Sequence, residues 1–308
     1  MSVVTTGFFD GVHLGHRHVL ERLVSSARER GEEALVVTFW PHPRTVLQQD
    51  ARDFRLLTSL EEKKARLLGC GVDRVEVLPF TRRFAALTAG EYLELLRDRF
   101  GASLVVMGYD NRIGSDGRTA EDLRTASSPL RSGFPLPGIL VVDEYSDAVI
   151  NPEHGEVVIP RLDRGISSTR IRQALAEGDI ATANAMLGYA YELYGVVVAG
   201  NRLGRTIGFP TANMQLYEPL KLVPGSGVYA VEVEVDGRHL RGMCNIGTRP
   251  TVGGTTRTIE TNIFDFDEDI YGLPIRLRLL RRIRDERRFD SLDGLRAQLC
   301  ADRDACCQ

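Results

Sequence analysis

The residues best suited to phosphate chemistry stand within the first sixteen positions. They form the run Gly7-Phe8-Phe9-Asp10-Gly11-Val12-His13-Leu14-Gly15-His16. The run follows a short β-branched segment and opens a helical one, and a helix N-terminus offers free backbone N–H groups and a positive dipole to an anion. Gly15 allows a close approach of the backbone. Two imidazoles facing one phosphate group can stabilise the charge that builds on phosphorus during transfer.

The run therefore predicts a phosphate site formed by Gly7, Phe9, Asp10 and Gly15, with His13 and His16 as catalytic residues. The sequence contains no G-x-x-x-x-G-K-[ST] motif, which excludes a Walker-type phosphate loop. The alternative is a glycine-rich turn with two incidental histidines. The strand that precedes the run and the F-D-G sequence before the histidines favour the functional interpretation.

A second candidate for phosphate binding is the segment I-S-S-T-R-I-R at 166–172. Ser167, Ser168 and Thr169 can cap a helix start and can also donate to a phosphate group. Arg170 and Arg172 add positive charge on different faces of the helix, so only one of them is expected to reach a ligand. The alternative is a capped basic helix that binds nothing.

Strands and helices alternate through the first half of the chain. Apolar runs predict strands at 3–6, 34–39, 74–78 and 104–108. Capping boxes that begin at Ser59 and Thr88 predict the starts of two helices. This alternation is typical of a parallel sheet with helices on both faces, in which ligands bind at the carboxyl ends of the strands.

The loops after Thr6, Phe39 and Met107 should therefore meet at one site. The polar stretch 115–138, rich in Gly, Ser and Pro, is expected to be a long loop of functional character.

The pattern changes near residue 188. Segments 194–198, 228–235, 240–246, 258–264 and 275–280 alternate apolar and polar residues and are separated by turn residues. That pattern predicts an antiparallel barrel or sandwich, followed by a helix at about 291–302. We expect two domains, 1–186 and 187–308, which also agrees with a length of 308 residues.

Composition narrows the class of protein. The chain has 39 basic and 42 acidic side chains and a net charge of -3, which gives no sign of a nucleic-acid or membrane partner. Its apolar runs are shorter than a membrane helix needs, and its first residues lack the features of a signal peptide. The five cysteines form no C-x-x-C pair, so we expect a cytoplasmic protein without a metal or disulfide framework.

The chain resembles the prokaryotic bifunctional riboflavin kinase/FAD synthetase family over nearly its full length. The first half carries F-D-G-V-H-L-G-H at 9–16, T-F-W-P-H-P at 38–43 and I-S-S-T-R-I-R at 166–172. The second half carries G-R-T-I-G-F-P-T-A-N at 204–213, N-I-G-T-R-P-T at 245–251, T-N-I-F-D-F at 261–266 and R-D-E-R-R-F at 284–289. The resemblance implies a Rossmann-like nucleotidyltransferase domain followed by a flavokinase-type antiparallel β-barrel with a C-terminal helix.

The resemblance implies FMN adenylylation in the first domain. The phosphate of FMN would attack the α-phosphorus of ATP and release pyrophosphate, which requires alignment and charge neutralisation but no protein nucleophile. His13, His16, Ser168 and Arg170 suit that task. Pro41, Pro43 and Asp110 are expected to contact flavin.

In the second domain the resemblance implies phosphorylation of riboflavin to FMN by ATP. The attacking hydroxyl must lose a proton, and the implied base is Glu260. Thr211 and Asn213 match the family's ligands for the Mg²⁺-nucleotide, and neutral oxygen ligands with substrate phosphates are typical for Mg²⁺. The remaining implied residues are Gly200, Gly204, Arg205 and Gly208 for the phosphate-side loop, and Arg284 and Glu286 for flavin. Taken alone, P-T-A-N is also compatible with a plain turn, and Glu260 with an exposed strand carboxylate.

The resemblance implies ATP, riboflavin and FMN as partners and a monomer or weak homo-oligomer. One feature departs from the family pattern: the family shows D-F-R-F-G-like runs, whereas this chain has D-N-R-I-G at 110–114. Aromatic stacking at Asn111 therefore does not carry over. Three other functions are compatible with parts of the sequence: adenylylation of another phosphorylated vitamin, an aminoacyl-tRNA synthetase and a flavin sensor. The flavokinase-like half, the missing K-M-S-K-S motif and the retained site residues argue against them in turn.

Overall fold

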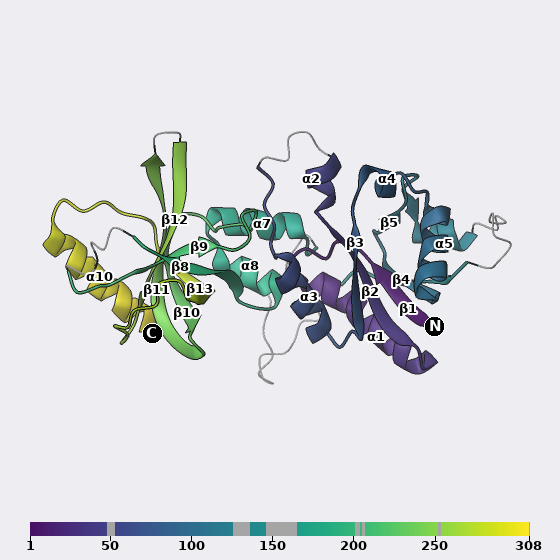
Figure 1. The fold of residues 1–308 in the computed structure, drawn as a ribbon, viewed down its shortest axis with the longest axis horizontal. Helices are drawn as coiled ribbons and strands as arrows, with labels where there is room; N and C mark the ends of the chain where they lie inside the picture. Colours follow the sequence, from purple (N-terminus) through teal and green to yellow (C-terminus); the bar gives the residue numbers. More distant parts are fainter. Residues whose placement is uncertain are drawn as a thin grey trace. The chain divides into compact units, whose positions relative to one another are not determined.

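The computed structural model describes residues 1–47, 53–125, 136–145, 165–200, 204, 207–251 and 254–307 (Figure 1). The chain divides into two compact units, Met1–Ser167 and Ser168–Gln308. The first is an α/β unit and the second is built around a β-barrel. Each unit has its own sheet and its own candidate site.

A five-stranded parallel sheet with the order β3-β2-β1-β4-β7 forms the centre of the first unit. Its strands are β1 (Ser2–Thr6), β2 (Glu33–Trp40), β3 (Arg74–Pro79), β4 (Ala102–Gly108) and β7 (Gly138–Val142). The first four confirm the strands predicted from apolar runs. Strand β7 was not predicted, because it begins at the end of the polar stretch that was expected to be a loop.

The helices of the first unit are α1 (Leu14–Arg30), α2 (Pro43–Leu47), α3 (Leu60–Gly69), α4 (Arg82–Ala85), α5 (Ala89–Phe100) and α6 (Ala120–Thr125). Both predicted capping boxes are present, from Ser59 to Glu62 and from Thr88 to Glu91. The expectation of one long loop at 115–138 was wrong for its described part. That part holds β6 (Arg118–Thr119), which pairs with β5 (Arg112–Ile113), and then α6.

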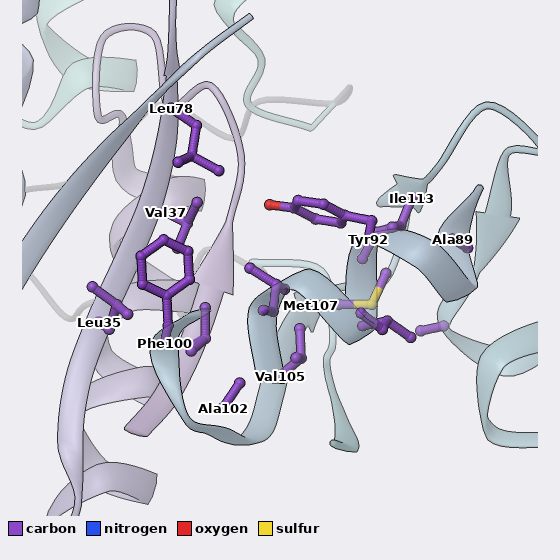
Figure 2. Close-up of a cluster of buried hydrophobic side chains, with 14 residues drawn as sticks. Leu35, Val37, Leu78, Ala89, Tyr92, Phe100, Ala102, Val105, Met107 and Ile113 are labelled. Atoms are coloured by element: carbon purple, nitrogen blue, oxygen red, sulfur yellow. The ribbon is translucent and has the colours of Figure 1, made fainter. Parts of the chain in front are cut away.

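Both faces of the sheet are covered, which explains why its strands are apolar without strict alternation. Consecutive strand residues point to opposite faces. Val37 therefore joins one core with Met107 and Tyr92 of α5, whereas Val36 joins another with Leu20 of α1. Figure 2 shows Val37 across from Tyr92 in the first of these cores. Helices on both faces leave the carboxyl ends of the strands as the open edge for a site.

The second unit contains a closed six-stranded antiparallel barrel with the order β10-β11-β12-β9-β8-β13. Its strands are β8 (Tyr191–Val198), β9 (Ala212–Leu216), β10 (Gly227–Val235), β11 (Arg238–Thr251), β12 (Gly254–Ile263) and β13 (Pro274–Arg284). The five predicted segments are confirmed. Because the sheet closes on itself, the unit is a barrel and not a sandwich. Strand β9 was not predicted, because five residues that begin with Ala-Asn carry little strand signal.

Two helices that precede the barrel in sequence belong to the same compact unit. Helices α7 (Ser168–Glu177) and α8 (Ile180–Leu187) contact it through backbone and amide hydrogen bonds. The Asn184 amide donates to the Leu279 carbonyl at 2.9 Å and accepts from the Tyr191 N–H at 2.8 Å. The Gly225 N–H donates to the Leu175 carbonyl at 2.8 Å. The boundary between the two compact units, at 167/168, thus lies before the domain boundary predicted at 186/187. The boundary between the two functional domains stays a prediction.

The C-terminal helix α10 (Leu292–Cys307) continues past the predicted end near residue 302. Cys306 packs against a small core formed by Phe209, Val228, Met243 and Phe264. That apolar contact gives the last turn a reason to stay helical, because most helical stability in proteins comes from packing of an apolar face.

The packing of α7 and α8 makes a prediction about stability. A fragment 187–308 should be less stable than a fragment 168–308 by about 6 kcal/mol or more, because Ile171, Leu175, Ile180 and Met186 are buried and each contributes about 1.5–3 kcal/mol. The melting temperature should fall by roughly 15 °C. Calorimetry of the two fragments measures the difference, and equal melting temperatures would show that the helices do not stabilise the barrel.

Candidate active sites

The loop between β1 and α1 has an unusual backbone. Phe9, Gly11 and Val12 have positive φ values of 53°, 85° and 39°. Non-glycine residues in this region cost about 1–3 kcal/mol each and persist only when the surroundings enforce them. Such strain is common at ligand-binding loops, because it points backbone N–H groups where a regular turn would not.

The carboxylate of Asp10 holds this strained loop in place. Asp10 is 3% exposed, and both of its oxygens accept from the Leu57 N–H at 3.1 Å. One of them also accepts from the Thr58 N–H at 3.1 Å and from the Thr58 hydroxyl at 3.2 Å. The Thr58 hydroxyl in turn accepts from the Gly11 N–H at 3.2 Å. Asp10 therefore ties the loop to the segment that starts α3.

The two histidines lie against each other at the start of α1. The Nδ1 atom of His13 accepts the His16 backbone N–H at 3.3 Å and caps the helix, which puts the N–H of a neutral His13 ring on Nε2. The rings stack with centroids 3.6 Å apart and an interplanar angle of 17°. A Cβ atom on Gly15 would lie 3.3 Å from the His13 ring, so glycine leaves room for this pair.

His16 is held as an uncharged ring. Burial lowers its pKa well below the ordinary value, and the neighbouring His13 and Lys63 lower it further. Phe9 packs edge-on against the ring at 5.2 Å. Its Nδ1 atom has no hydrogen-bond partner among the described residues. A neutral imidazole presents one donor and one acceptor, and the buried atom without a partner is suited to a bound ligand.

A hollow of about 450 Å³ opens beside Gly7 at the carboxyl end of the sheet. Its lining includes Thr6, Phe39 and Asn111, which follow or end β1, β2 and β4, and this confirms that these loops meet at one site. Three further lining residues, Phe80, Phe84 and Tyr92, were missed by the sequence analysis.

Tyr92 forms part of the floor of this hollow. Its hydroxyl and that of Thr6 are 2.5 Å apart, and burial raises the pKa of Tyr92. The aromatic residues could have been found from their positions: Phe80 directly follows β3, and Phe84 and Tyr92 stand on the two helices after it.

Three residues predicted to contact flavin do not line this hollow. Pro41 follows a cis peptide bond after Trp40, Pro43 begins α2, and Asp110 is exposed in the turn after β4. Asn111, which follows Asp110, lines the hollow instead. A flavin contact by the first three residues stays a prediction.

The second predicted phosphate segment begins beside the histidine loop. A Cβ atom on Gly15 would lie 4.0 Å from the Ile166 carbonyl oxygen. Ser167 ends the first compact unit. Ser168, Thr169 and Arg170 form the first turn of α7 in the second unit, and their contact with phosphate stays a prediction.

The barrel contains a hollow of about 380 Å³ that brings together most of the predicted kinase residues. Its lining includes Gly204, Thr211, Asn213, Glu260, Arg284 and Glu286. On β12, Glu260 and Asn262 face this hollow, whereas Thr261 and Ile263 face a second hollow of about 340 Å³. Because side chains alternate along a strand, the two sides of β12 line two different hollows. Thr211 borders both hollows.

Strand pairing positions the polar groups of the barrel hollow that contains Glu260. Glu260 lies opposite Asn213 of β9 and Asn245 of β11. A Cβ atom on Gly200 would lie 2.1 Å from the Asn213 amide nitrogen, so only glycine fits beside this side chain. The Gly204 carbonyl accepts from the Phe209 N–H at 2.8 Å, and Gly208 has a φ of 83° that favours glycine. Arg205 lies outside the described residues.

Arg284 is anchored by a residue that the sequence analysis missed. Its guanidinium group donates to both carboxylate oxygens of Asp302 on α10, at 2.7–3.1 Å, and Asp302 is 1% exposed. Gln298 also donates to Asp302 at 2.9 Å. Such a fork-shaped pair fixes the arginine beside the hollow. No local signal distinguishes Asp302 from the other acidic residues of α10.

The oxygen donors around the barrel hollow that contains Glu260 suit a hard cation that also binds a substrate. Thr211 and Asn213 both face it and offer neutral oxygens, the kind of ligand that Mg²⁺ takes together with phosphates and water. Within the described ranges, no group of three or more His, Cys, Asp or Glu side chains could hold a metal ion without a substrate.

A parallel α/β unit with two stacked histidines at a helix start, and a barrel with a carboxylate-lined hollow, form the architecture expected of a nucleotide-dependent transferase with two domains. The FAD synthetase model matches residues 1–134, and the riboflavin kinase model matches residues 187–308.

Relatives support both matches. The bifunctional riboflavin kinase/FMN adenylyltransferase of Escherichia coli K12 is 41% identical over 302 residues, which cover 97% of this chain and 90% of that one. Its namesake from Bacillus subtilis is 35% identical, with coverages of 98% and 90%. The chain belongs to the bifunctional riboflavin kinase/FMN adenylyltransferase family.

A solved structure from Streptococcus pneumoniae, described as a macrolide-efflux protein, has the same fold over the whole length. It is 35% identical, covers 99% of this chain and 93% of its own, and superposes with a TM-score of 0.86. In the part of this chain that the structure describes, no helix is both long and apolar enough to cross a membrane.

The role of Asp10 leads to a second prediction. Asp10→Asn should destabilise the first unit by about 2–3 kcal/mol, because the amide group turns one acceptor into a donor that faces the N–H groups of Leu57 and Thr58. Trp40, the chain's single tryptophan, lies in this unit, so urea unfolding followed by its fluorescence reports on it. The matched control is Asp98→Asn, which removes an exposed ion pair with Arg97 and should change little. Equal unfolding midpoints for the two variants would show that the hydrogen bonds of Asp10 do not stabilise this unit.

Proposed function

We propose that this chain phosphorylates riboflavin to FMN in its barrel domain and adenylylates FMN to FAD, with release of pyrophosphate, in its α/β domain. ATP supplies the transferred group in both steps. The observation that carries the proposal is the convergence of Thr211, Asn213 and Glu260 on one hollow, separate from the paired histidines in the other unit. The proposed domain boundary is 186/187, between the two activities.

The kinase step needs a hydroxyl to become a nucleophile. The ribityl hydroxyl of riboflavin attacks the γ-phosphorus of ATP, the bond to the β-phosphate oxygen breaks, and ADP leaves. Glu260 accepts the hydroxyl proton, and its pairing opposite Asn213, a proposed ligand of the Mg²⁺-nucleotide, supports this role. When bound, Mg²⁺ neutralises phosphate charge, and Thr211 and Asn213 would hold it. Gly200, Gly204 and Gly208, with Arg205, form the phosphate side.

The two hollows of the barrel suit the two substrates of this step. The hollow that contains Glu260 also contains Phe289, Arg284 and Glu286, which provide an apolar ring and charged groups for flavin. The hollow on the other side of β12 is bordered by Asp267 and Asp269, whose carboxylates suit ribose hydroxyls better than phosphates. We assign it to the nucleoside part of ATP, with Thr211 at the junction.

The adenylyl step needs alignment instead of a base. A phosphate oxygen of FMN attacks the α-phosphorus of ATP while the bond to pyrophosphate breaks. His13 and His16 donate to the charge that develops, and Ser167, Ser168, Thr169 and Arg170 supply further donors. Gly7 and Gly15 keep the backbone close, Phe9 supports His16, and Asp10 holds the loop instead of contacting phosphate directly.

The aromatic hollow beside Gly7 suits the flavin ring system of FMN. Phe39, Phe80, Phe84 and Tyr92 provide apolar walls, and Asn111 offers an amide at the place where the family has an aromatic residue. The predicted contacts by Pro41, Pro43 and Asp110 would form its outer edge. The cytoplasmic location, the partners ATP, riboflavin and FMN, and the monomer or weak homo-oligomer belong to the same proposal.

The simplest test uses the whole chain. Incubation with riboflavin, ATP and Mg²⁺, followed by chromatography of the flavins, should show FMN and then FAD. A flavin-binding sensor would produce neither compound, and a kinase alone would stop at FMN.

His16→Ala should abolish FAD formation from FMN and leave FMN formation from riboflavin unchanged. Loss of a positioned donor at a developing charge reduces the rate by about 10²–10³. His18→Ala, on the same helix but packed against Tyr145, is the matched control and should keep both activities. FAD formation at the normal rate in His16→Ala would refute the assignment.

Glu260→Gln should have the opposite effect. Glutamine keeps the size of the side chain but cannot accept the hydroxyl proton, so FMN formation should fall by about 10²-fold while FAD formation from supplied FMN continues. Glu232→Gln changes a half-exposed carboxylate on β10 of the same barrel and serves as the control. The assay is FMN production at saturating ATP, and an unchanged rate would leave Glu260 as an ordinary strand carboxylate.

A further inference from the structure

Lys63 of α3 is a buried cation directly behind the phosphate loop. Its side chain is 1% exposed, and its Nζ atom donates to the Phe39 carbonyl at 3.3 Å. The same atom lies 3.7 Å from the centre of the Phe8 ring and 5.7 Å from that of the Trp40 ring. A buried ammonium group is expensive unless such partners compensate it. Its position therefore calls for a reason other than stability.

The ammonium group determines where Phe8 lies. The Phe8 ring has Lys63 over its face and His42 edge-on at 4.0 Å, and His42 in turn packs against Phe54 at 4.2 Å. The Phe8 carbonyl accepts from the Thr38 hydroxyl at 3.2 Å. Phe8 is the residue that connects Gly7 to the strained turn at Phe9, so fixing its ring fixes the entrance to the phosphate loop.

Charged and titratable groups face Lys63 from the loop and from α1, while β2 presents the Phe39 carbonyl and the Trp40 ring. Burial lowers the pKa of Lys63 to about 8, and the Asp10 carboxylate opposes that shift. The positive charge in turn contributes to the lowered pKa of His16, which also faces His13. The state of the catalytic ring is thus coupled to the charge on Lys63.

We propose that Lys63 is a positioning residue for adenylyl transfer: its ammonium group holds Phe8 and the end of β2 so that the phosphate loop and a neutral His16 are aligned for the nucleotide. The inference rests on the proposed assignment of His13 and His16 to this step. Lys63 acts through Phe8 and His16 and does not itself reach the reacting phosphates, because its side chain is enclosed.

The test compares Lys63→Met, Lys63→Arg and Lys64→Met in the full chain. Lys64 is the next residue on α3, and it is partly exposed and paired with Glu61 at 3.6 Å, so its variant is the matched control. Lys63→Met keeps the length of the side chain and removes the charge. It should lower kcat/KM for FAD formation by about 10- to 100-fold, because small misplacements of a reacting group have effects of this size. FMN formation should not change.

The pH profile of kcat/KM gives the readout that a merely structural lysine would not move. In the unchanged chain the rate should fall as pH rises through about 8, where Lys63 loses its proton. Lys63→Met should lack this alkaline limb, and Lys63→Arg should move it to higher pH because arginine stays charged. Loss of the positive charge also raises the pKa of His16, so the acidic limb should move to higher pH in Lys63→Met.

Stability separates positioning from folding. Unfolding followed by Trp40 fluorescence should show that Lys63→Met is as stable as the unchanged chain or more so, since a buried charge has been removed. Lower activity with preserved stability and an altered pH profile would support the proposal. Unchanged kcat/KM, or a rate loss with an unchanged pH profile, would overturn it. Should His16→Ala keep its activity, the site assignment itself fails, which is a distinct result.

Discussion

The first unit depends on the hydrogen bonds between the Asp10 carboxylate and the backbone of Leu57 and Thr58. They hold a loop whose φ values at Phe9 and Val12 would otherwise relax, and they fix the start of α3 against it. The same segment then places Lys63 behind Phe8. A single buried carboxylate thereby connects a strained backbone, a buried cation and the paired histidines. The acidic residue inside the predicted phosphate motif accepts hydrogen bonds from the protein's own backbone.

In the barrel, the alternation of side chains along a strand positions the residues of the hollows. Glu260 and Asn262 of β12 face one hollow, and Thr261 and Ile263 face the other. Neighbouring residues of one strand can therefore line two separate hollows without a loop between them. Thr211 borders both hollows. Closure of the barrel keeps both walls rigid, because it leaves no open sheet edge.

The contacts of the flanking helices explain why the compact units divide at 167/168 and not at the predicted domain boundary of 186/187. Asn184 joins α8 to β13 and β8, and the Leu175 carbonyl joins α7 to the loop at Gly225. The segment that carries the second predicted phosphate motif is thus packed on the barrel. At the other end, Asp302 of α10 holds Arg284 beside the hollow that contains Glu260. Helix α10, which lies outside the motifs, therefore positions a residue inside one of them.

The amino-acid sequence by itself determined the elements that short-range physics controls. Capping boxes at Ser59 and Thr88 marked helix starts, and apolar runs and alternation marked nine of the strands. Motifs identified the family and most of the predicted residues around the barrel hollow that contains Glu260. Strand β7 was missed because it follows a polar stretch, and β5, β6 and β9 were missed because they are short. The tertiary structure alone decided the contacts of Asp10, Lys63, Tyr92 and Asp302. Asp10 finds its partners 47 residues away and Tyr92 finds Thr6 at a separation of 86, and no local pattern records such contacts. Burial also lowers the pKa of Lys63 and of His16, because desolvation depends on which side chains the fold brings around them.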